Sequence, residues 1–581
     1  MVRVGGQAKA KGLAVLVLAL AVMSTVVGPG GAASTPKTGG TLYMLGNGDV
    51  DYMDPNVTYY TVGQLNVRMW SRFLMSYPSV EGKTTQISPD LAVAPPKVTN
   101  GGLDYSFTIR KGAMWATTPP RQVTAADAVL GLKRSCNPVK PTAALADYEA
   151  LVAGLTQFCT AFSKVKPEVG AIAAFIKSHN ISGVSVDPKD PLTVHFKLTH
   201  PASYFPALTS FGGFAPAPVE YLEYLPISSA LAQHTISDGP YKIASYNPGK
   251  SIDFVRNPAW KASSDPLRHA YVDEIKVDET VPQASVQQQL QANSPTANAQ
   301  WGDSQPPPAE IPGLIASKDP NLTLGPTLGM DPFLIFNMVD PNENGAMKDL
   351  QIRRAISYAI DRSKLVQVAA GPRVSPPMTQ VLPPGVAGYD NFDLYPYNPA
   401  KAKAMLGGKT LKLKLLYQAD NQKQTKMFQS IQFDLSKVGI TVTGVGVPTA
   451  DIYSKYLLVP DVAKRGVWDI STDSWFPDWY GNNTVNYFLP IFSSKSWAPA
   501  GANLNLYKNP KVDALIDKGA STGSLAAANK IWQQVDKLVM QDAAIYPITS
   551  LNFAMYHSKA VQGAIFVPGL QGLDPTNVWL S

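Results

Sequence analysis

The segment at residues 473–483 reads DSWFPDWYGNN. Pro477 and Gly481 interrupt any regular helix or strand, so we predict a loop. Loops are normally polar, whereas this one carries a carboxylate, Asp478, among four aromatic rings. The rings belong to Trp475, Phe476, Trp479 and Tyr480. Two interpretations follow: the rings fill a core beside a turn, or they form the floor of a ligand cleft in which a desolvated carboxylate binds a cation.

The composition indicates a large globular chain with more than one domain. At 581 residues the chain exceeds what one hydrophobic core usually holds. Hydrophobic residues make up 45% and charged residues 16%, with 49 prolines and 44 glycines, which is typical of a loop-rich globular protein and not of a disordered one. The sequence contains no dense block of Lys and Arg, so it gives no support for a nucleic-acid partner.

Residues 1–33 have the parts of an export signal. Three basic residues precede an apolar run at residues 13–27, and small residues lead to a cleavage site after Ala33. A membrane anchor is the weaker alternative, because the run is shorter than the ~20 residues that a spanning helix needs. Loss of the three basic residues takes the net charge from +7 to +4. We therefore expect an exported, soluble chain, extracellular or associated with the cell surface.

The only cysteines are Cys136 and Cys159, which are 23 positions apart. In an exported protein such a pair is more typical of a local disulfide than of a metal or redox site. Neither cysteine follows the signal directly, so the usual bacterial lipid-attachment site is absent.

Hydrophobic periodicity in the first half predicts strands that surround a helical insert. Alternating apolar residues indicate strands at 41–45, 103–109, 192–198 and 274–277, and a hairpin at 239–258. Thr124 and Asp127 have the spacing of a capping box at the start of a helix. The insert, at 143–176, is predicted to be largely helical. Residues 294–312 are rich in Pro, Gln, Ala and Ser and are interpreted as a linker or exposed loop.

The order of predicted helices and strands in the second half is typical of an α/β unit. Residues 352–365 have the spacing of one amphipathic helix, with Arg353 away from its apolar stripe. A strand at 411–415, a helix from Asn421 and a strand from Ile440 predict a right-handed parallel crossover. A final long helix begins at Ser524 and is predicted to bury apolar residues from Leu525 onwards.

Catalytic and metal-binding motifs are missing. The sequence has no H-E-x-x-H or G-x-S-x-G motif, and its Gly-Lys-Ser/Thr triplets lack the earlier glycine of a phosphate-binding loop. His195 and His200 are five positions apart without an acid that completes a metal set. We predict no catalytic residue, metal or cofactor. The pair Asp473 and Asp478 leaves a secreted hydrolase as an alternative.

Short motifs along most of the chain resemble one family. They are GGTL at 39–42 with DP at 54–55, PDLA at 89–92, FTIRKG at 107–112 with TAAD at 124–127, GPYK at 239–242 with RNP at 256–258, RAISYAIDR at 354–362 and VGI at 438–440. In this order they resemble the extracellular solute-binding proteins of family 5, the oligopeptide- and dipeptide-binding components of bacterial ABC importers.

The resemblance implies a two-lobed, periplasmic-binding-protein-like α/β fold with hinge strands and an extra subdomain inserted in the first lobe. The first lobe would comprise residues 34–71, 196–275 and 546–581, the inserted subdomain 72–195, and the second lobe 276–545. The strands that cross between the lobes would lie near 274–278 and 544–548.

The resemblance also implies a ligand site. In the family an extended peptide lies between the lobes, and its α-ammonium pairs with the aspartate of a Trp-x-x-Asp loop. Residues 475–478 match this loop, so Asp478 takes the anchor role. Backbone partners would come from Tyr59, Tyr60 and Thr61. The four rings of the opening segment are expected to contact the ligand.

We therefore expect an extracytoplasmic binding protein that captures a peptide or peptide-like solute by hinge closure and delivers it to membrane permease subunits of an ABC importer. It is expected to be a monomer without a nucleic-acid partner. Three departures from the family pattern are residues 116–120 after the Arg-Lys-Gly strand, Ala128 in place of a common Val, and the lack of an arginine at 471–483 to meet a peptide carboxylate. An oligosaccharide ligand is the alternative within the family.

Overall fold

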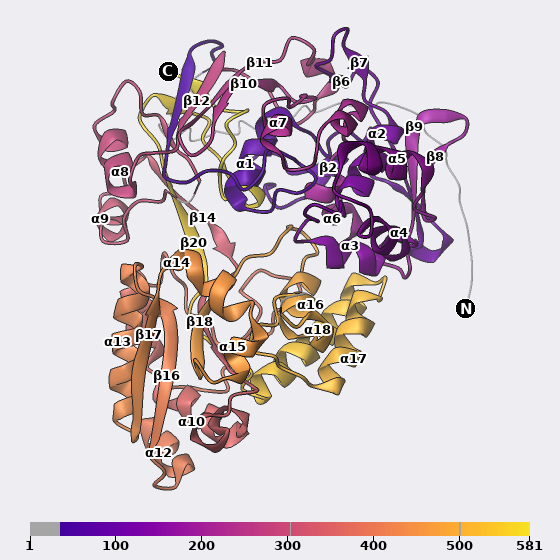
Figure 1. The fold of residues 1–581 in the computed structure, drawn as a ribbon. Helices are drawn as coiled ribbons and strands as arrows, with labels where there is room; N and C mark the ends of the chain where they lie inside the picture. Colours follow the sequence, from indigo (N-terminus) through magenta and orange to yellow (C-terminus); the bar gives the residue numbers. More distant parts are fainter. Residues whose placement is uncertain (1–34, 303, 499–500) are drawn as a thin grey trace, which may run out of the picture. The chain divides into compact units, whose positions relative to one another are not determined.

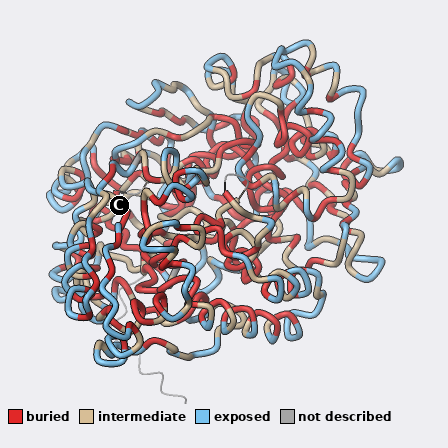
Figure 2. The backbone as a smooth tube through the Cα atoms, turned by 60° about the horizontal axis from the view of Figure 1, so that its bottom comes forward, coloured by how far each residue is buried: buried red, intermediate tan, exposed pale blue. Residues whose placement is uncertain are grey.

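The computed structural model describes residues 35–302, 304–498 and 501–581. The predicted export signal, residues 1–33, lies outside this range. Residues Lys37–Ser581 form one compact unit, which contains every element described below (Figure 1). Buried residues follow the interior segments of this unit, and exposed residues follow its peripheral loops (Figure 2).

The first sheet has five strands in the order β10-β11-β12-β1-β13. Its strands are β1 (Thr41–Leu45), β10 (Tyr241–Asn247), β11 (Ser251–Arg256), β12 (Glu274–Asp278) and β13 (Ala299–Gln300). The predicted hairpin is the antiparallel pair β10 and β11, and β1 runs parallel to β12 and β13. Leu42 and Met44 are fully buried on one face of β1, because side chains alternate between the two faces of a strand.

A four-stranded antiparallel sheet with helices lies between β1 and β10 in sequence. Its order is β4-β5-β9-β8, with β4 (Lys97–Thr99), β5 (Asp104–Thr108), β8 (Val184–Asp187) and β9 (Asp190–Lys197). The helices are α2 (Ala125–Arg134), α3 (Leu145–Leu151), α4 (Leu155–Phe162) and α5 (Val169–Ser178). The predicted capping box of Thr124 and Asp127 begins α2. The predicted helical insert is thus three separate helices, α3 to α5.

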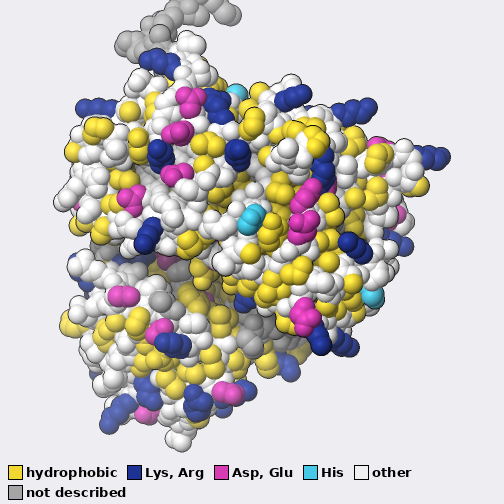
Figure 3. Space-filling view, turned by 45° about the horizontal axis from the view of Figure 1, so that its top comes forward, with side chains coloured by type: hydrophobic (Ala, Val, Ile, Leu, Met, Phe, Trp, Pro, Cys, Tyr) yellow, Lys and Arg dark blue, Asp and Glu magenta, His cyan; other side chains and the backbone are white. Residues whose placement is uncertain are grey.

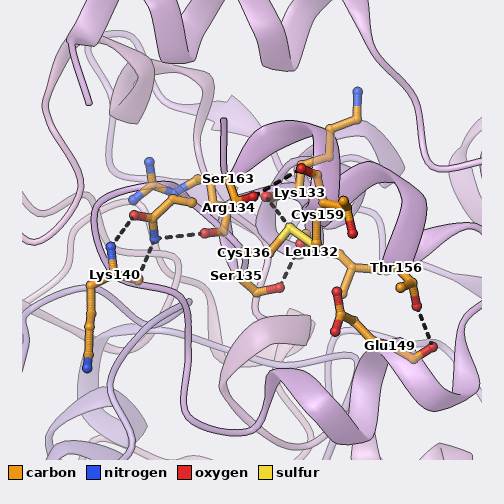
Figure 4. The surroundings of a disulfide bond; sticks show 12 residues. Leu132, Lys133, Arg134, Ser135, Cys136, Lys140, Glu149, Thr156, Cys159 and Ser163 are labelled. Atoms are coloured by element: carbon orange, nitrogen blue, oxygen red, sulfur yellow. Dashed lines mark hydrogen bonds between the residues drawn. A yellow bond between two sulfur atoms is a disulfide. The ribbon is translucent and has the colours of Figure 1, made fainter. Parts of the chain in front are cut away.

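A disulfide joins Cys136, just after α2, to Cys159 in α4 (Figure 4). The two Cα atoms are 5.5 Å apart. A crosslink over a loop of this length restricts the unfolded chain and contributes about 3 kcal/mol to stability. The loop that it closes carries the whole of α3.

The second sheet has five strands in the order β17-β16-β18-β15-β19. They are β15 (Met330–Phe336), β16 (Leu411–Gln418), β17 (Ile440–Val447), β18 (Ile470–Trp475) and β19 (Ile545–Pro547). The predicted crossover is present: β16 and β17 are parallel, and α13 (Gln422–Ser436) connects them. Asn421 caps α13 with its side chain, and Gly439 adopts a left-handed φ of 90° before β17.

Two long strands connect the two sheets. β14 (Leu322–Leu328) and β20 (Leu551–Tyr556) pair antiparallel with each other and lie between the two sheets in Figure 1. The expected positions of the crossing strands, 274–278 and 544–548, are wrong. The first is β12, inside the first sheet, and the second contains β19, at the edge of the second sheet.

Several helices cover the second sheet or pack beside it. They are α10 (Leu350–Ala359), α11 (Arg362–Val368), α12 (Pro399–Leu406), α14 (Thr449–Asp451), α15 (Pro460–Lys464), α16 (Val485–Phe492), α17 (Pro510–Ala520) and α18 (Leu525–Gln541). The single helix predicted at 352–365 is two helices, because Asp361 caps α11 and ends the first helix. Arg353 is buried rather than outward, and Leu525 is 43% exposed, both contrary to the prediction.

The predicted linker at 294–312 is partly ordered structure. It contains β13, and Trp301 in it is 1% exposed. Helices α8 (Gln283–Gln291) and α9 (Ile311–Ala316) flank it. The composition therefore misled the prediction, because Pro and Ser neighbour a short strand that pairs with β1.

The remaining α-helices and strands are ten residues long or shorter. They are α1 (Thr61–Trp70), α6 (Phe205–Leu208), α7 (Ser229–Ala232), β2 (Met75–Ser76), β3 (Ser88–Pro89), β6 (Met114–Trp115), β7 (Arg121–Gln122), β21 (Val561–Gln562), β22 (Phe566–Val567), β23 (Gly572–Leu573) and β24 (Trp579–Leu580). Within the described ranges, no helix combines the length and apolar character that crossing a membrane requires.

Candidate ligand site

The aromatic segment begins as a strand and continues as a loop. β18 ends at Trp475, and the loop leads into α16. Gly481 adopts a φ of 68°, and a Cβ atom there would lie 2.8 Å from the carbonyl oxygen of Thr85. Glycine is therefore needed for both the left-handed conformation and the close approach. Thr85 precedes β3, whereas β18 belongs to the second sheet. This close approach therefore brings the loop after β18 against the first-sheet side of the chain.

Asp478 lies at the centre of this loop and is partly buried. The Tyr59 hydroxyl donates to its Oδ1 at 2.7 Å, and Asn486 Nδ2 donates to its Oδ2 at 3.2 Å. Burial raises the pKa of Asp478 to about 6, although both hydrogen bonds act in the opposite direction. No ion pair within the described part of the chain involves Asp478. The carboxylate is thus hydrogen-bonded, but no cationic side chain of the described residues neutralises its charge.

The segment before α1 positions Tyr59. Asp51 Oδ2 accepts the backbone N–H of Tyr59 at 2.7 Å and that of Tyr60 at 3.3 Å. Upstream, Asp54 forms a buried ion pair with Arg134 of α2. Side-chain acceptors of this kind hold a loop in one conformation. The Asp-Pro motif thus fixes the loop that presents the Tyr59 hydroxyl to Asp478.

A cavity that encloses about 430 Å³, its opening included, lies beside Asp478. It is lined by Gln64, Arg68, Phe73, Ser76, Tyr77, Ser210, Phe211, Asp478, Val567, Gly569 and Leu570. Its one guanidinium, Arg68, is paired with Asp574 at 2.6 Å and also donates to Ser76 and to the Tyr77 carbonyl. Arg68 therefore leaves the charge of Asp478 uncompensated.

Trp479 and Tyr480 attach the loop to the first-sheet side. The Trp479 ring stacks on Tyr204, with centroids 6.0 Å apart and 14° between the planes. The Tyr77 hydroxyl accepts the N–H of Tyr480 at 2.8 Å and donates to its carbonyl at 3.0 Å. Asn482 also donates to Ser203 at 2.8 Å. These aromatics thus pack as a core, as the first interpretation expects, and Trp479 also lines a cavity.

A second, smaller pocket of about 240 Å³, its opening to solvent included, is lined by a residue that the sequence analysis did not identify. It is lined by Asp147, Ala150, Tyr204, Trp479, Val485, Asn486 and Leu489. Burial, and then the charge of Asp478, raise the pKa of Asp147 to about 7. Sequence gave only a weak signal, since an acid in the first turn of a helix is common and needs no ligand to explain it.

The other predicted residues occupy different positions. Trp475 and Phe476 are partly buried and pack against the hydrophobic cores, outside the lining of either cavity. Tyr60 is 63% exposed, and Thr61 is the first residue of α1. Of the predicted set, the structure therefore brings together Tyr59, Asp478 and Trp479.

The acid pair of the hydrolase alternative is not a coupled pair in the structure. Asp473 accepts a hydrogen bond from Tyr453 at 2.9 Å, whereas Asp478 accepts from Tyr59. Burial raises the pKa of Asp473 to about 7, and the charge of Asp478 is not among the causes. In the described ranges, no group of three His, Cys, Asp or Glu side chains is arranged to hold a metal ion.

The profile of the family described as "Bacterial extracellular solute-binding proteins, family 5 Middle" matches residues 86–499. The chain belongs to this solute-binding family. Among curated family 5 relatives, the glutathione-binding protein GsiB of Salmonella paratyphi A is 26% identical over 65% of this chain and 71% of its own. The probable D,D-dipeptide-binding periplasmic protein DdpA of Escherichia coli K12 is 25% identical over 67% of this chain and 72% of its own.

Solved structures with the same fold include two binding proteins of this type. The clavulanic acid biosynthesis oligopeptide binding protein 2 matches with a TM-score of 0.81 and 22% identity, over 94% of this chain and 97% of its own. The ABC transporter-associated periplasmic binding protein DppA from Helicobacter pylori, in complex with the peptide STSA, matches with a TM-score of 0.70 and 20% identity over 94% and 98%. The two-lobed fold expected for family 5 is confirmed.

Proposed function

We propose that this family 5 protein is an exported binding protein that captures a peptide or peptide-like solute between its lobes and delivers it to the permease of an ABC importer. The single observation that carries the proposal is Asp478, whose hydrogen-bonded carboxylate has no cationic partner among the described residues and borders the larger cavity. The α-ammonium of a peptide supplies the missing charge. The printed names of the relatives, which include glutathione- and dipeptide-binding proteins, agree with this ligand class.

The physical basis of capture is the cost of an unpaired buried charge. An ion removed from water is destabilised by several kcal/mol unless a partner of opposite charge is present. A ligand with a free amine removes this penalty only when the lobes are closed around it. Ligand binding therefore favours the closed conformation, as expected for a hinge-bending protein.

We assign the boundaries of the proposed lobes from the two sheets. The first lobe comprises 37–321 and 557–581, with the subdomain 72–195 inserted in it. Residues 276–321 were expected in the second lobe and are assigned here to the first, because β13 pairs with β1. The second lobe comprises 329–550. β14 and β20 form the hinge, because they leave both sheets and pair only with each other.

Surface charge and the site geometry support a binder rather than a nucleic-acid protein or an enzyme. Charged side chains of both signs are scattered over the visible face in Figure 3, without a large patch of one sign. The separate hydrogen-bond partners of Asp473 and Asp478 disfavour joint acid–base catalysis. A peptide recovered intact after long incubation with the protein is the expected result, and cleavage products would contradict it.

The test of the anchor role uses native mass spectrometry with alanine peptides of two to five residues, each with a free or an acetylated amine. Asp478→Asn is expected to weaken binding of the free-amine peptides by about 2 kcal/mol or more, as for loss of one partner of a buried ion pair. The acetylated peptides should bind weakly to both proteins. Asp473→Asn is the matched control, because Asp473 is a buried acid in β18, five positions before Asp478, and lines neither cavity.

Equal losses for free and acetylated peptides would contradict the anchor role. A parallel measurement with cello-oligosaccharides tests the alternative ligand class. Tight binding of the sugars together with no binding of any peptide would replace the proposed ligand.

A further inference from the structure

The carboxyl end of β12 carries a buried acid without a hydrogen-bond partner. Glu279 follows β12 directly and is 2% exposed. Both of its carboxylate oxygens are buried, and neither accepts a hydrogen bond from any of the described residues. Burial, and then the charge of Asp49, raise the pKa of Glu279 to about 8. A buried carboxylate without donors is costly, so this position requires either a proton or a ligand that compensates the charge.

Asp49 lies beside Glu279, in the loop between β1 and α1. The backbone N–H of Val50 donates to Asp49 Oδ1 at 2.7 Å. The N–H of Gly249 and the hydroxyl of Tyr246 donate to Oδ2, at 2.7 Å and 2.9 Å. These neutral donors orient the carboxylate, but the described residues form no ion pair with either acid. Two carboxylates thus lie together without a counter-charge.

A backbone carbonyl and solvent border the same pair. The N–H of Gly48 donates to the carbonyl of Glu279 at 3.1 Å, which joins the two segments. The Gly48 carbonyl accepts the Trp301 indole N–H at 3.3 Å, and this indole also lies close enough to Glu279 to oppose the rise in its pKa. Gly48 is exposed, and a Cβ atom there would meet no atom within 4 Å. Water can therefore reach this side of the pair.

We propose that Asp49, Glu279 and the carbonyl of Gly48 bind a Ca²⁺ ion. A divalent cation neutralises both carboxylates, whereas a shared proton neutralises only one. Both oxygens of Glu279 are free, which permits the bidentate contact that Ca²⁺ accepts. The coordination of Ca²⁺ is flexible, so water molecules can complete a site that lacks a third acidic side chain.

The ion would fasten a loop that leads to the ligand site. Asp49 lies between β1 and α1, whereas Glu279 lies between β12 and α8, so Ca²⁺ would crosslink two segments that are distant in sequence. The β1–α1 loop also carries Asp51, which accepts the N–H of Tyr59. Ca²⁺ would therefore stabilise the loop from which Tyr59 donates to Asp478. This consequence for the ligand rests on the proposed function, whereas the ion site does not.

The test measures metal binding by the purified protein after treatment with a chelator. Isothermal titration calorimetry with calcium chloride is expected to show one site with a dissociation constant of about 0.1–1 mM, as in other extracellular Ca²⁺ modules. A Ca²⁺ concentration of about 10 mM should raise the unfolding temperature by about 2 °C or more, because the ion binds only the folded chain. Tb³⁺ replaces Ca²⁺ and emits when a neighbouring indole is excited. Excitation of Trp301 should therefore give Tb³⁺ emission that excess Ca²⁺ removes.

Two variants locate the ion. Glu279→Gln should abolish the Ca²⁺ response, because the substitution removes one charge and one oxygen ligand. Its amide can donate to Asp49, so in chelator this variant should be at least as stable as the wild-type protein. Glu274→Gln is the matched control and should keep the wild-type response. Glu274 is an acid at the start of β12 that pairs with Lys276 at 3.5 Å.

Four results would overturn the inference. The absence of any Ca²⁺-dependent shift in the wild-type protein would mean that the two acids share a proton instead. A response that persists in Glu279→Gln, or one that is lost equally in Glu274→Gln, would place the ion elsewhere. A larger shift with Mg²⁺ than with Ca²⁺ would contradict the proposed ion. No peptide is present in these experiments, so failure of the proposed function would not alter their outcome.

Discussion

At the scale of single residues, Asp478 is held in a state that favours a cationic ligand. Tyr59 and Asn486 orient its carboxylate, yet burial still raises its pKa to about 6. Hydrogen-bond donors thus fix the direction of the group without removing its charge. An ammonium group gains most from a carboxylate that is oriented in advance and poorly solvated.

This pKa predicts how ligand binding depends on pH. The ionised form of Asp478 exists above a pH of about 6, so affinity for a free-amine peptide should fall as the pH drops through that value. From pH 7 to pH 5 the loss should be about 10-fold, since the ionised fraction falls by that factor. The ligand amine stays protonated throughout, so it does not cause the loss. Isothermal titration calorimetry with a peptide of neutral first residue measures the profile.

Other titratable groups lie around Asp478. Tyr59, Tyr148 and Tyr480 face it and stay neutral, because burial raises their pKa values well above 10. Among the described groups whose pKa the charge of Asp478 raises, Asp147, with a pKa of about 7, is the one that titrates between pH 5 and 8. Asp478→Asn should therefore flatten most of the profile. An unchanged pH dependence in that variant would assign the titration to Asp147.

Sequence reasoning reached only part of this residue pattern. The Trp-x-x-Asp motif and the Asp-Pro loop identified Asp478 and Tyr59, which are bonded in the structure. Asp147 was missed because nothing local marks it: its significance comes from Trp479 and Asn486, more than 300 positions away in sequence. Trp475 and Phe476 carried the same aromatic signal as Trp479, but they pack into cores.

At the scale of elements, the loop after β18 bonds the second-sheet side of the chain to the first-sheet side. Its contacts reach Tyr59, Tyr77 and residues 203–204, all on the first-lobe side. Tyr77 is central, because its one hydroxyl satisfies both the N–H and the carbonyl of Tyr480. The peptide group of Tyr480 is thereby bonded without a strand or helix.

We expect Tyr77→Phe to speed ligand release. The variant leaves the buried N–H and carbonyl of Tyr480 without their partner, and an unsatisfied buried group costs about 1–3 kcal/mol. That cost applies only in the closed form, in which Tyr480 lies against Tyr77. The substitution therefore destabilises the closed form relative to the open one. Stopped-flow fluorescence should show a rise in the dissociation rate of about fivefold or more, as 1 kcal/mol implies.

A matched variant separates this effect from general destabilisation. Tyr241→Phe removes a buried hydroxyl that donates to Val272 at 3.0 Å, within the first lobe and away from the loop. It should lower stability without altering the dissociation rate. Equal acceleration in both variants would mean that the bonds from Tyr77 to Tyr480 do not control ligand release.

Elements were predicted well where one local pattern determined them. The alternation at 103–109 and the capping box before α2 depend only on neighbouring residues, and both are present. The helix at 352–365 failed because an i, i+3, i+4 pattern does not show that Asp361 caps a new helix. Arg353 is buried because it donates to the carbonyls of Met347, Asp542 and Ala543, which lie on segments that the pattern does not include.

At the scale of the whole molecule, the strands that connect the two sheets were the feature that sequence placed wrongly. β14 and β20 are separated by more than 200 positions and are defined by their pairing with each other. The expected crossings at 274–278 and 544–548 also contain strands, β12 and β19, so strand propensity does not distinguish them from β14 and β20. Long-range pairing decides which strand joins a sheet and which one leaves it.

Closure about this hinge gives the last prediction. A free-amine peptide should lower the radius of gyration measured by small-angle scattering, because it neutralises Asp478 and stabilises the seated loop. In Asp478→Asn the same peptide concentration should produce little change, since the ligand then gains no more from the closed form than from the open one. Population shift requires such a difference in affinity between the two states.

The acetylated peptide supplies the control on the ligand side. It offers the same backbone and side chains without the ammonium, so it should leave the radius of gyration of the wild-type protein nearly unchanged. Replacing Cys136 and Cys159 with serine supplies a control on the protein side, because it weakens the inserted subdomain by about 3 kcal/mol without touching β14 or β20. That variant should melt at a lower temperature and still close around the free-amine peptide. Closure driven equally by the acetylated peptide would show that the charge of Asp478 does not control the hinge.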